Sequence, residues 1–157
     1  MFRKTKYLYA VCNGIAGELS KIPDEAFSSG MLGVGYSIQP RDGTFYSPVS
    51  GKAGNVADSA HAYTFTTKDG VDVLVHIGID TVELKGDGFE PLVKAGQNVN
   101  AGDVIARVDL SKIRNAGLNT VSAVLITNPE MIDGIEYDLG NVSAKDDAVL
   151  SYKIRKG

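Results

Sequence analysis

The chain has 157 residues, 43% hydrophobic and 22% charged, which is ordinary for a globular protein with one core, so we expect a single domain over residues 1–157. A net charge of −3, with basic runs only near the two ends, argues against a nucleic-acid-binding surface. Cys12 is the only cysteine and no apolar run reaches the length of a signal peptide or membrane span, so we expect a cytoplasmic protein.

Short runs rich in β-branched and aromatic residues follow one another along the chain, separated by turns that contain glycine. This pattern predicts an all-β fold, an antiparallel sandwich or barrel-like sheet with a few short helical turns. The short helices are expected at residues 23–27, 89–93 and 110–116, the last capped by Ser111. In chain order, strands are expected at residues 8–12, 15–19, 34–39, 44–49, 53–57, 61–67, 71–77, 81–84, 97–99, 104–109, 120–127 and 148–154.

Two segments of the chain are echoed later in the sequence. Residues 9–17 align with residues 46–54, keeping a tyrosine, an alanine and two glycines at the same spacing. A weaker echo relates residues 96–103 to residues 140–146. Such echoes indicate duplicated β units that each bury half of a core.

The only two histidines, His61 and His76, flank a predicted hairpin. A two-residue loop at Lys68-Asp69 would pair His61 with His76, and a loop at Asp69-Gly70 would make them diagonal neighbours on one face. A three-residue loop would break this arrangement, because a one-residue slip moves a side chain to the other face. Two of the three registers therefore bring the imidazoles together.

Strand alternation places His76 away from the core. Val71, Val73, Val75 and Ile77 would occupy one face of their strand, leaving Asp72, Leu74 and His76 on the other. Two imidazoles on an accessible face suggest a two-ligand metal site, an acid/base pair or a nucleophilic nitrogen.

Several alternatives fit the sequence less well. Catalytic zinc normally takes three protein ligands, and neither a paired H-x-H nor an H-E-x-x-H pattern is present. A serine hydrolase would need a G-x-S-x-G elbow, which is missing, and Cys12 is interpreted as a small buried strand residue. Residues 93–105 resemble half of a biotinyl or lipoyl carrier domain, but Lys68 at the hairpin tip lacks the motif of a modified lysine.

Residues 73–89 closely resemble the phosphorylation-site segment of the glucose-type enzyme IIA of the bacterial phosphoenolpyruvate-dependent sugar phosphotransferase system. Further similarity, in the family's order, covers most of the chain: residues 23–33, 47–51 and 61–63 upstream, and residues 96–103 and 109–110 downstream. The resemblance implies an antiparallel β-sandwich with duplicated elements, in agreement with the echoes. It implies no cofactor and no membrane insertion.

The resemblance also implies a role for each residue of the site. His76 matches the histidine that the histidine-containing phosphocarrier protein phosphorylates, on its tele nitrogen, and that donates the phosphoryl group to the cysteine of an enzyme IIB domain. His61 matches the second histidine, which assists transfer. Ser59 stands where relatives often carry threonine, whose hydroxyl orients His61; serine keeps the hydroxyl with more rotational freedom.

A relay protein needs a docking surface rather than a deep pocket. The residues that match the family's partner-binding patch are Ala26, Phe27, Met31, Leu32, Leu74, Gly78, Asp80 and Val82. Met31 and Leu32 also fit a core position, and Asp80 also fits a plain turn aspartate. Ala26 and Ala57 depart from the bulkier residues usual in the family, which leaves the regulatory targets open.

Three functions remain after these comparisons of motifs. The first is a phosphocarrier enzyme IIA. The second is a purely regulatory domain of the same fold that controls transporters or kinases by binding them. The third is a metal-dependent hydrolase; short of that, His61 and His76 could share a zinc ion at a partner interface without catalysis. Both histidines are intact, which favours the first function.

Overall fold

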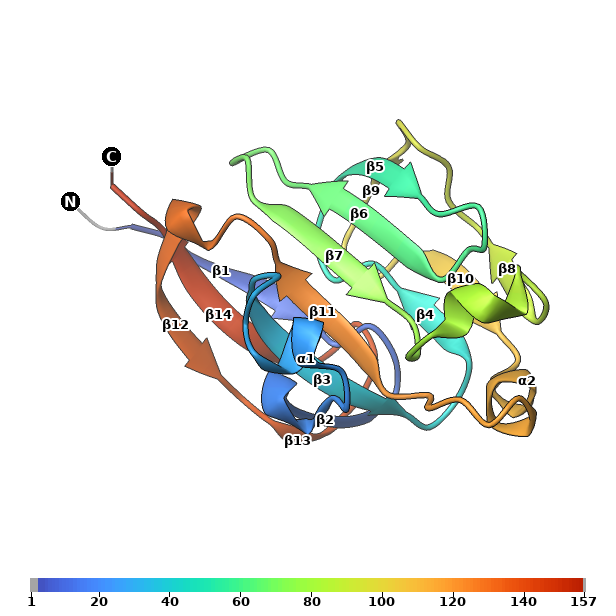
Figure 1. Cartoon of the computed structure of the whole chain (residues 1–157). Helices are drawn as coiled ribbons and strands as arrows, with labels where there is room; N and C mark the ends of the chain where they lie inside the picture. Colours follow the sequence, from blue (N-terminus) through green and yellow to red (C-terminus); the bar gives the residue numbers. More distant parts are fainter. Residues whose placement is uncertain (1–2, 157) are drawn as a thin grey trace.

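Antiparallel pairing organises the chain in the computed structural model, which describes residues 3–156 (Figure 1). The predicted domain's extreme ends, residues 1–2 and 157, lie outside the described residues. The strands are β1 (Thr5–Tyr9), β2 (Gly14–Glu18), β3 (Val34–Pro40), β4 (Thr44–Tyr46), β5 (Gly51–Val56), β6 (Ala62–Thr66), β7 (Asp72–His76), β8 (Phe89–Pro91), β9 (Asn98–Val99), β10 (Val104–Val108), β11 (Ser122–Ile126), β12 (Ile132–Tyr137), β13 (Gly140–Val142) and β14 (Ala148–Ile154).

The strands form a sandwich. One layer is an eight-stranded sheet in the order β13-β2-β3-β11-β7-β6-β5-β9. Two three-stranded sheets, β1-β14-β12 and β4-β10-β8, lie behind it in Figure 1. The first and last described strands pair with each other, Thr5 opposite Lys153, so the two ends of the chain lie side by side. The expected all-β antiparallel fold is confirmed.

The main core fills the space between the layers. Alternate residues of β7 face it, and Val71, Val73, Val75 and Ile77 are all buried as strand parity predicts. They meet side chains from the opposite layer, including Leu8 of β1, Phe45 of β4, Ile105 of β10 and Leu150 of β14. Burial of this much apolar surface is the main favourable contribution to the fold.

A second, smaller apolar cluster lies on the opposite face of the large sheet. It consists of Ile22, Phe27, Ile79, Val121, Ala123 and Leu125, with Leu19 and Leu74 packed against it. Two short helical segments, η1 (Leu19–Lys21) and α1 (Glu25–Ser28), cover this face. The helical turns therefore lie on the same side of the sheet as His76.

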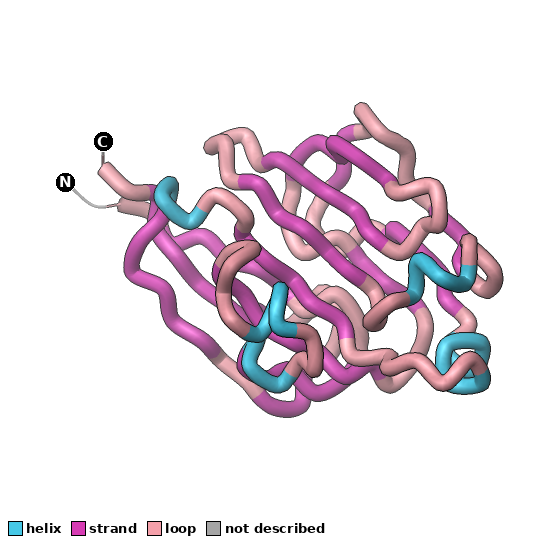
Figure 2. The backbone as a smooth tube through the Cα atoms, viewed as in Figure 1, coloured by secondary structure: helices cyan, strands magenta, loops and turns pink. Residues whose placement is uncertain are grey.

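The helices are short and peripheral, as expected (Figure 2). Besides η1 and α1, they are η2 (Thr81–Leu84), α2 (Leu110–Asn115) and η3 (Pro129–Met131). Asp24 caps α1 by accepting a hydrogen bond from the Ala26 amide at 3.0 Å. No helix within residues 3–156 is long and apolar enough to cross a membrane.

Four local predictions are wrong. Residues 81–84 form the helical turn η2 rather than a strand. Residues 89–91 form β8 rather than a helix, because Phe89–Pro91 pairs with β10. The cap of α2 is Asp109, which accepts from the amide of Ser111, so Ser111 is the donor and not the cap. Cys12 is buried, but in the bend between β1 and β2 rather than in a strand.

The hairpin register also differs from both favourable predictions. Ala62 lies opposite His76 and Thr66 opposite Asp72, so Lys68, Asp69 and Gly70 form a three-residue loop. In this register His61 falls opposite Ile77, whose amide donates to the His61 carbonyl at 2.7 Å. His61 precedes β6 and lies in a bend, where Ala60 adopts a positive φ of 56°. The bend releases His61 from strand alternation, and its ring turns toward His76 in spite of the register.

Candidate active site

His76 is the last residue of β7, on the face that carries Leu74 and the small apolar cluster. Its sheet neighbours are Ala62 of β6 and Ala123 of β11, one on either side. Because each neighbour has only a methyl group as its side chain, neither crowds the imidazole from the adjacent strands. The ring is half-buried and packs against Phe27 of α1, with the ring centroids 5.0 Å apart.

One hydrogen bond fixes the tautomer of His76. Its Nδ1 lies 2.8 Å from the carbonyl oxygen of Gly78. A carbonyl can only accept, so Nδ1 carries the proton, and in the neutral ring the lone pair is on Nε2. Nε2 is therefore the ring nitrogen whose lone pair is available to an electrophile.

The Gly78 carbonyl is held by the loop that follows β7. Gly78 has a positive φ of 71°, and a Cβ there would lie 2.5 Å from Thr81 Cγ2. The Gly78 amide donates to Ser122 Oγ at 3.1 Å, and the Ser122 hydroxyl donates to the Thr120 carbonyl at 3.0 Å. Thr81 donates its hydroxyl to the carbonyl of Ile77. These contacts fix the acceptor that orients His76.

His61 lies beside His76, with the ring centroids 5.1 Å apart and the planes nearly perpendicular at 83°. The prediction that the two imidazoles come together is thus confirmed, although the register behind it was wrong. Nδ1 of His61 is buried without a hydrogen-bond partner among the described residues. Ser59 lies in the turn before His61, and its hydroxyl forms no hydrogen bond with the ring.

Both histidines are disposed to be neutral. Burial lowers the pKa of His61. Burial, and next the proximity of His61, lower the pKa of His76, while the Gly78 carbonyl and the carboxylates of Asp24 and Asp80 oppose the shift. Since an imidazole attacks through its lone pair, a lowered pKa keeps His76 in its nucleophilic form at neutral pH.

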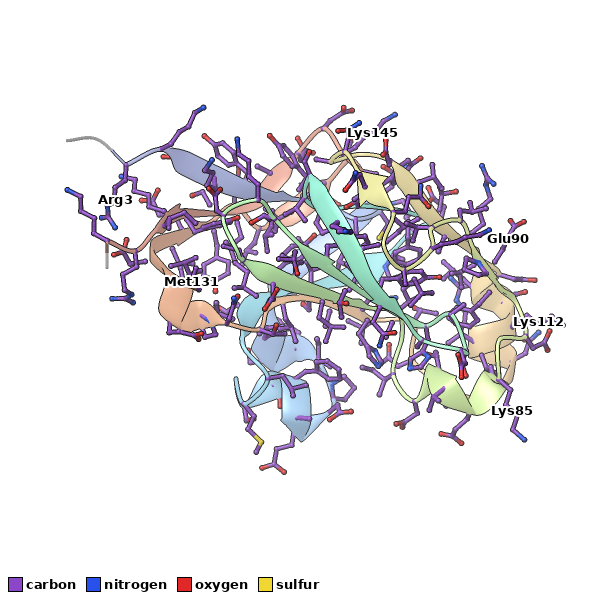
Figure 3. All side chains as sticks on the ribbon, turned by 90° about the horizontal axis from the view of Figure 1, so that it is seen from above. Arg3, Lys85, Glu90, Lys112, Met131 and Lys145 are labelled. Carbon is purple, nitrogen blue, oxygen red and sulfur yellow. The ribbon has the colours of Figure 1, made fainter. Side chains whose placement is uncertain are left out.

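The other predicted partner-binding residues differ in their exposure. Phe27 and Gly78 are buried, and Leu74 and Ala26 are half-buried. Met31 is 80% exposed, Val82 53% and Leu32 40%, so the alternative core position for Met31 and Leu32 is wrong. In Figure 3, α1 and η2, beside which Lys85 is labelled, project from the same side of the sheets.

Asp80 is exposed and adopts a left-handed conformation, with φ 60° and ψ 19°, at the start of η2. It is therefore a turn residue, and its carboxylate still acts on the pKa of His76. The two interpretations of Asp80 are compatible, because the turn is what places the acid at the edge of the site. Asp24, on the other side, was missed as part of the site; its helix-cap position was the only signal in the sequence.

The described residues contain no cluster of three or more His, Cys, Asp or Glu side chains that could hold a metal ion. His61 and His76 alone would supply two ligands, fewer than catalytic zinc normally takes. A zinc ion completed by a partner's side chains stays a prediction.

The site is thus a neutral, tautomer-locked imidazole beside a second imidazole, on a shallow surface with exposed apolar residues. This arrangement defines a class of protein that carries a reactive group on histidine and passes it between protein partners. Residues 6–132 match the family described as phosphoenolpyruvate-dependent sugar phosphotransferase system, EIIA 1. The chain belongs to this family.

Curated relatives agree with the family match. The chain is 38% identical to the glucose-specific EIIA component of Staphylococcus epidermidis over 131 residues, 83% of this chain and 79% of the relative. It is 39% identical to that of Staphylococcus aureus over 132 residues, 83% of this chain and 80% of the relative. In Streptococcus pneumoniae the match is to a glucose-specific EIICBA component, 38% identical over 142 residues, which make up 90% of this chain and 20% of the relative.

Among solved structures, glucose permease IIA from Mycoplasma capricolum superimposes with a TM-score of 0.89 at 36% identity, covering 96% of this chain and 97% of that one. The chain is accordingly a phosphotransferase component, a phosphocarrier of the sugar phosphotransferase system that takes part in sugar uptake. The family works together with an enzyme IIB domain.

Proposed function

We propose that His76 accepts the phosphoryl group from the histidine-containing phosphocarrier protein and donates it to the cysteine of an enzyme IIB domain. The observation that carries this proposal is the bond between His76 Nδ1 and the Gly78 carbonyl, which leaves the Nε2 lone pair for phosphorus. In the first step an Nε2–P bond forms on His76 and the N–P bond of the donor histidine breaks. In the second, an S–P bond forms on the IIB cysteine and the Nε2–P bond breaks.

His61 assists the second step. Phosphorylation places about two negative charges beside the His61 ring, 5.1 Å from the His76 ring in the unmodified chain. An N–H of His61 directed at the phosphoryl oxygens stabilises the charge as the group moves. Because phosphoryl transfer has a loose transition state, positioning and charge stabilisation supply most of the catalysis.

Ser59 orients His61 in this proposal. Nδ1 of His61 is buried and lacks a partner, and Ser59 is two residues away in the same turn. Rotation of the serine hydroxyl toward Nδ1 would donate a hydrogen bond to it and leave the proton of the ring on Nε2. A buried polar atom without a partner is costly, which favours this pairing.

The partners dock on the shallow surface around the two rings. The exposed Met31, Leu32 and Val82 form its apolar rim, and Phe27 and Leu74 form its floor together with Ala26 and Gly78. Asp80 adds a negative charge at the edge, which would attract a basic partner and speed the encounter. Residues 1–157 act as one domain, in the cytoplasm, where Cys12 keeps its free thiol.

The test is incubation with phosphoenolpyruvate, enzyme I and the phosphocarrier protein, followed by intact-mass measurement. The chain should gain one phosphoryl group, and His76→Ala should gain none. A chain that gains nothing, or a His76→Ala variant that is still labelled, would contradict the proposal.

His61→Gln separates acceptance from donation. This variant should still be phosphorylated, but should lose most of its transfer to a IIB domain, since the charge on the phosphoryl oxygens is no longer stabilised. Ser59→Ala should show a smaller loss in the same step. A panel of IIB domains, including one from a glucose permease, then identifies the sugar route.

A further inference from the structure

A groove of about 730 Å³ lies on a different part of the surface from the histidines, since none of its lining residues belongs to the histidine site. It runs along β1, between that strand and the loop that joins β6 to β7. Its walls include Tyr7 and Tyr9 of β1, Lys52 of β5, and Lys68 and Asp69 of the loop. Thr66, which lines the groove, pairs with Asp72 of β7. At about 3.3 Å per residue, the four residue steps from Asp72 to His76 place this end of the groove roughly 13 Å along the strand from His76.

β1 is an edge strand, since it pairs with β14 on one side only within the described residues. The side chains of the groove come from both faces of β1, Lys6 from one and Tyr7 from the other. A groove lined from both faces of a strand lies at the edge of that strand.

Hydrogen bonds at the end of β1 show which backbone groups face this edge. The Ala10 amide donates toward the β14 side, to Asp147, and the Tyr9 amide donates away from it, to Pro48. The register shift between Leu8 and Tyr9 places the extra residue in β14. The backbone N–H and C=O groups of successive β1 residues therefore alternate regularly between the two edges of the strand. The N–H and C=O groups of Tyr7, and before it Thr5, therefore point to the free edge.

The groove is basic. Lys6, Lys52 and Lys68 line it, against the single acid Asp69. Lys6 is paired with Asp69 at 3.3 Å, whereas Lys52 and Lys68 make no ion pair within the described part of the chain. In natural proteins an inward-pointing lysine on an edge strand often prevents that strand from pairing with another chain. Here the charge of Lys6 is neutralised by Asp69, so the edge of β1 lacks this protection.

We propose that this edge groove binds an extended, acidic segment of a partner protein, which adds to β1 as a further strand. The backbone of the segment would pair with Thr5 and Tyr7, one set of its side chains would contact the tyrosine rings, and its carboxylates would meet Lys52 and Lys68. Because the groove is distant from His76, the segment would bind while the histidine surface is engaged in the relay.

The experiment titrates the ¹⁵N-labelled full chain with a short, capped peptide of alternating glutamate and valine. The amide signals of Thr5 and Tyr7 should shift, and their hydrogen exchange should slow as they become bonded. A lysine and valine peptide of the same length should not bind. Signals that shift only around His61 and His76, or the absence of saturable binding, would overturn the proposal.

Two further arms separate strand addition from simple charge attraction. The same acidic peptide with every amide N-methylated should lose binding at least about tenfold, because neither of its edges can donate to β1. Lys52→Glu/Lys68→Glu should also weaken binding at least about tenfold, whereas Lys94→Glu/Arg114→Glu, with the same change in net charge outside the residues that line the groove, should not.

Unchanged binding of the methylated peptide would overturn strand addition. This arm uses the natural chain, so its outcome does not depend on whether a variant folds. Concentration-dependent dimerisation of the unliganded chain that protects Thr5 and Tyr7 would also overturn the proposal, since a second copy would then be the occupant. Phosphorylation of His76 by the relay should be unaffected in both double variants, which shows that they are folded and keeps this test independent of the relay function.

Discussion

Gly78 determines where the acceptor for His76 lies. Replacing it with alanine places a Cβ 2.5 Å from Thr81 Cγ2 and 3.1 Å from the Asn119 carbonyl, at a φ that disfavours side chains. We expect Gly78→Ala to lower the free energy of unfolding by about 2–4 kcal/mol, by combining backbone strain with overpacking. Displacement of the carbonyl should reduce the rate of phosphoryl acceptance at least about tenfold, measured by single-turnover labelling.

Gly96→Ala is the matched control for this prediction. Gly96 also has a positive φ, 87°, but a Cβ there would meet nothing within 4 Å. Gly96→Ala should lower the free energy of unfolding by only about 1–2 kcal/mol and leave phosphoryl acceptance unchanged. Equal acceptance rates in the two variants would show that the Gly78 carbonyl does not orient His76.

The lowered pKa values of His61 and His76 predict a pH dependence of stability. In the unfolded chain both imidazoles protonate near pH 6.5, while in the folded chain they resist protonation until a lower pH. Below pH 6.5 the unfolded state therefore binds more protons, and the free energy of unfolding falls as the pH falls. Above that range both states are neutral and the histidines contribute no slope.

Urea unfolding between about pH 7.5 and about pH 5.5 measures this slope. The double variant His61→Gln/His76→Gln should lose stability less steeply than the natural chain over the same interval. Parallel curves would mean that the histidines titrate alike in both states. Phosphoryl acceptance should likewise persist below pH 6.5, because neutral His76 is the reactive form.

At the scale of single residues, the sequence predicts the candidate reactive residue, His76, but not the residues that hold its hydrogen-bond acceptor in place. Alternation along one strand was sufficient to separate His76 from the valine stripe, since that pattern is local. The roles of Ser122 and Gly78 were not predictable in the same way. Their contact joins residues 44 positions apart, and it depends on a sheet register that residue types alone do not determine.

Among the elements, β11 matters to the site because it holds the loop after β7. Ser122 is buried and connects the Gly78 amide to the Thr120 carbonyl. Ser122→Ala removes the acceptor and leaves a buried amide without a partner, so we expect the free energy of unfolding to fall by about 1–3 kcal/mol. Phosphoryl acceptance should slow as the loop shifts, measured by the same labelling assay.

Ser37→Ala controls for the loss of a buried serine. Ser37 lies on β3 opposite Ala123 and does not contact Gly78. Its substitution should change the free energy of unfolding by less than about 1 kcal/mol and leave acceptance intact. A Ser122→Ala variant no worse than Ser37→Ala would remove Ser122 from the support of the site.

The secondary structure was predictable where alternation and turn residues agree. The strands at residues 34–39 and 148–154 were placed almost to the residue, while β8, β12 and β13 were missed. β8 and β13 are three residues long, and β12 has glycine at position 134 and few buried side chains. Such strands are defined by their pairing with β10, β14 and β2 rather than by their own pattern.

The hairpin shows the limit of turn preferences. An Asp69-Gly70 turn is a strong local signal, yet the loop has three residues and pairs Thr66 with Asp72. Tertiary packing decides the register, because only this one lets Tyr63 and Phe65 of β6 enter the core beside Val73 and Val75. The two histidines meet because a bend, not the ladder, positions His61.

At the scale of the whole molecule, the sequence echoes correspond to a repeated hydrogen-bond pattern. The Tyr9 amide donates to the Pro48 carbonyl, and the Tyr46 amide donates to the Val11 carbonyl, which are the positions that the echo relates to each other. The second echo shows the same repetition in strand pairing. Val142 pairs with Gly14, and the equivalent Val99 pairs with the equivalent Gly51. The duplication therefore builds the sandwich from two related units that exchange bonds with each other.

Asn13 and Ser50 occupy equivalent positions in the two units, and each accepts a hydrogen bond from a later strand connection. Asn13 Oδ1 accepts from the Ala144 amide at 2.8 Å, and Ser50 Oγ accepts from the Ala101 amide at 2.9 Å. The first bond is partly buried and the second is exposed, so water can replace only the second.

We therefore expect Asn13→Ala to lower the free energy of unfolding by about 1–2 kcal/mol and Ser50→Ala to lower it by less than about 1 kcal/mol, measured by urea unfolding. Burial accounts for most of the difference, because the two bonds have similar lengths and equivalent positions. Asn13→Ala also removes the exposed hydrogen bond from Asn13 Nδ2 to Asp42 Oδ2, which adds little. A larger loss of stability in Ser50→Ala than in Asn13→Ala would contradict this prediction, since the exposed bond would then contribute more than the partly buried one. Neither variant should alter phosphorylation of His76, since both side chains lie in the connections between strands rather than beside the imidazoles.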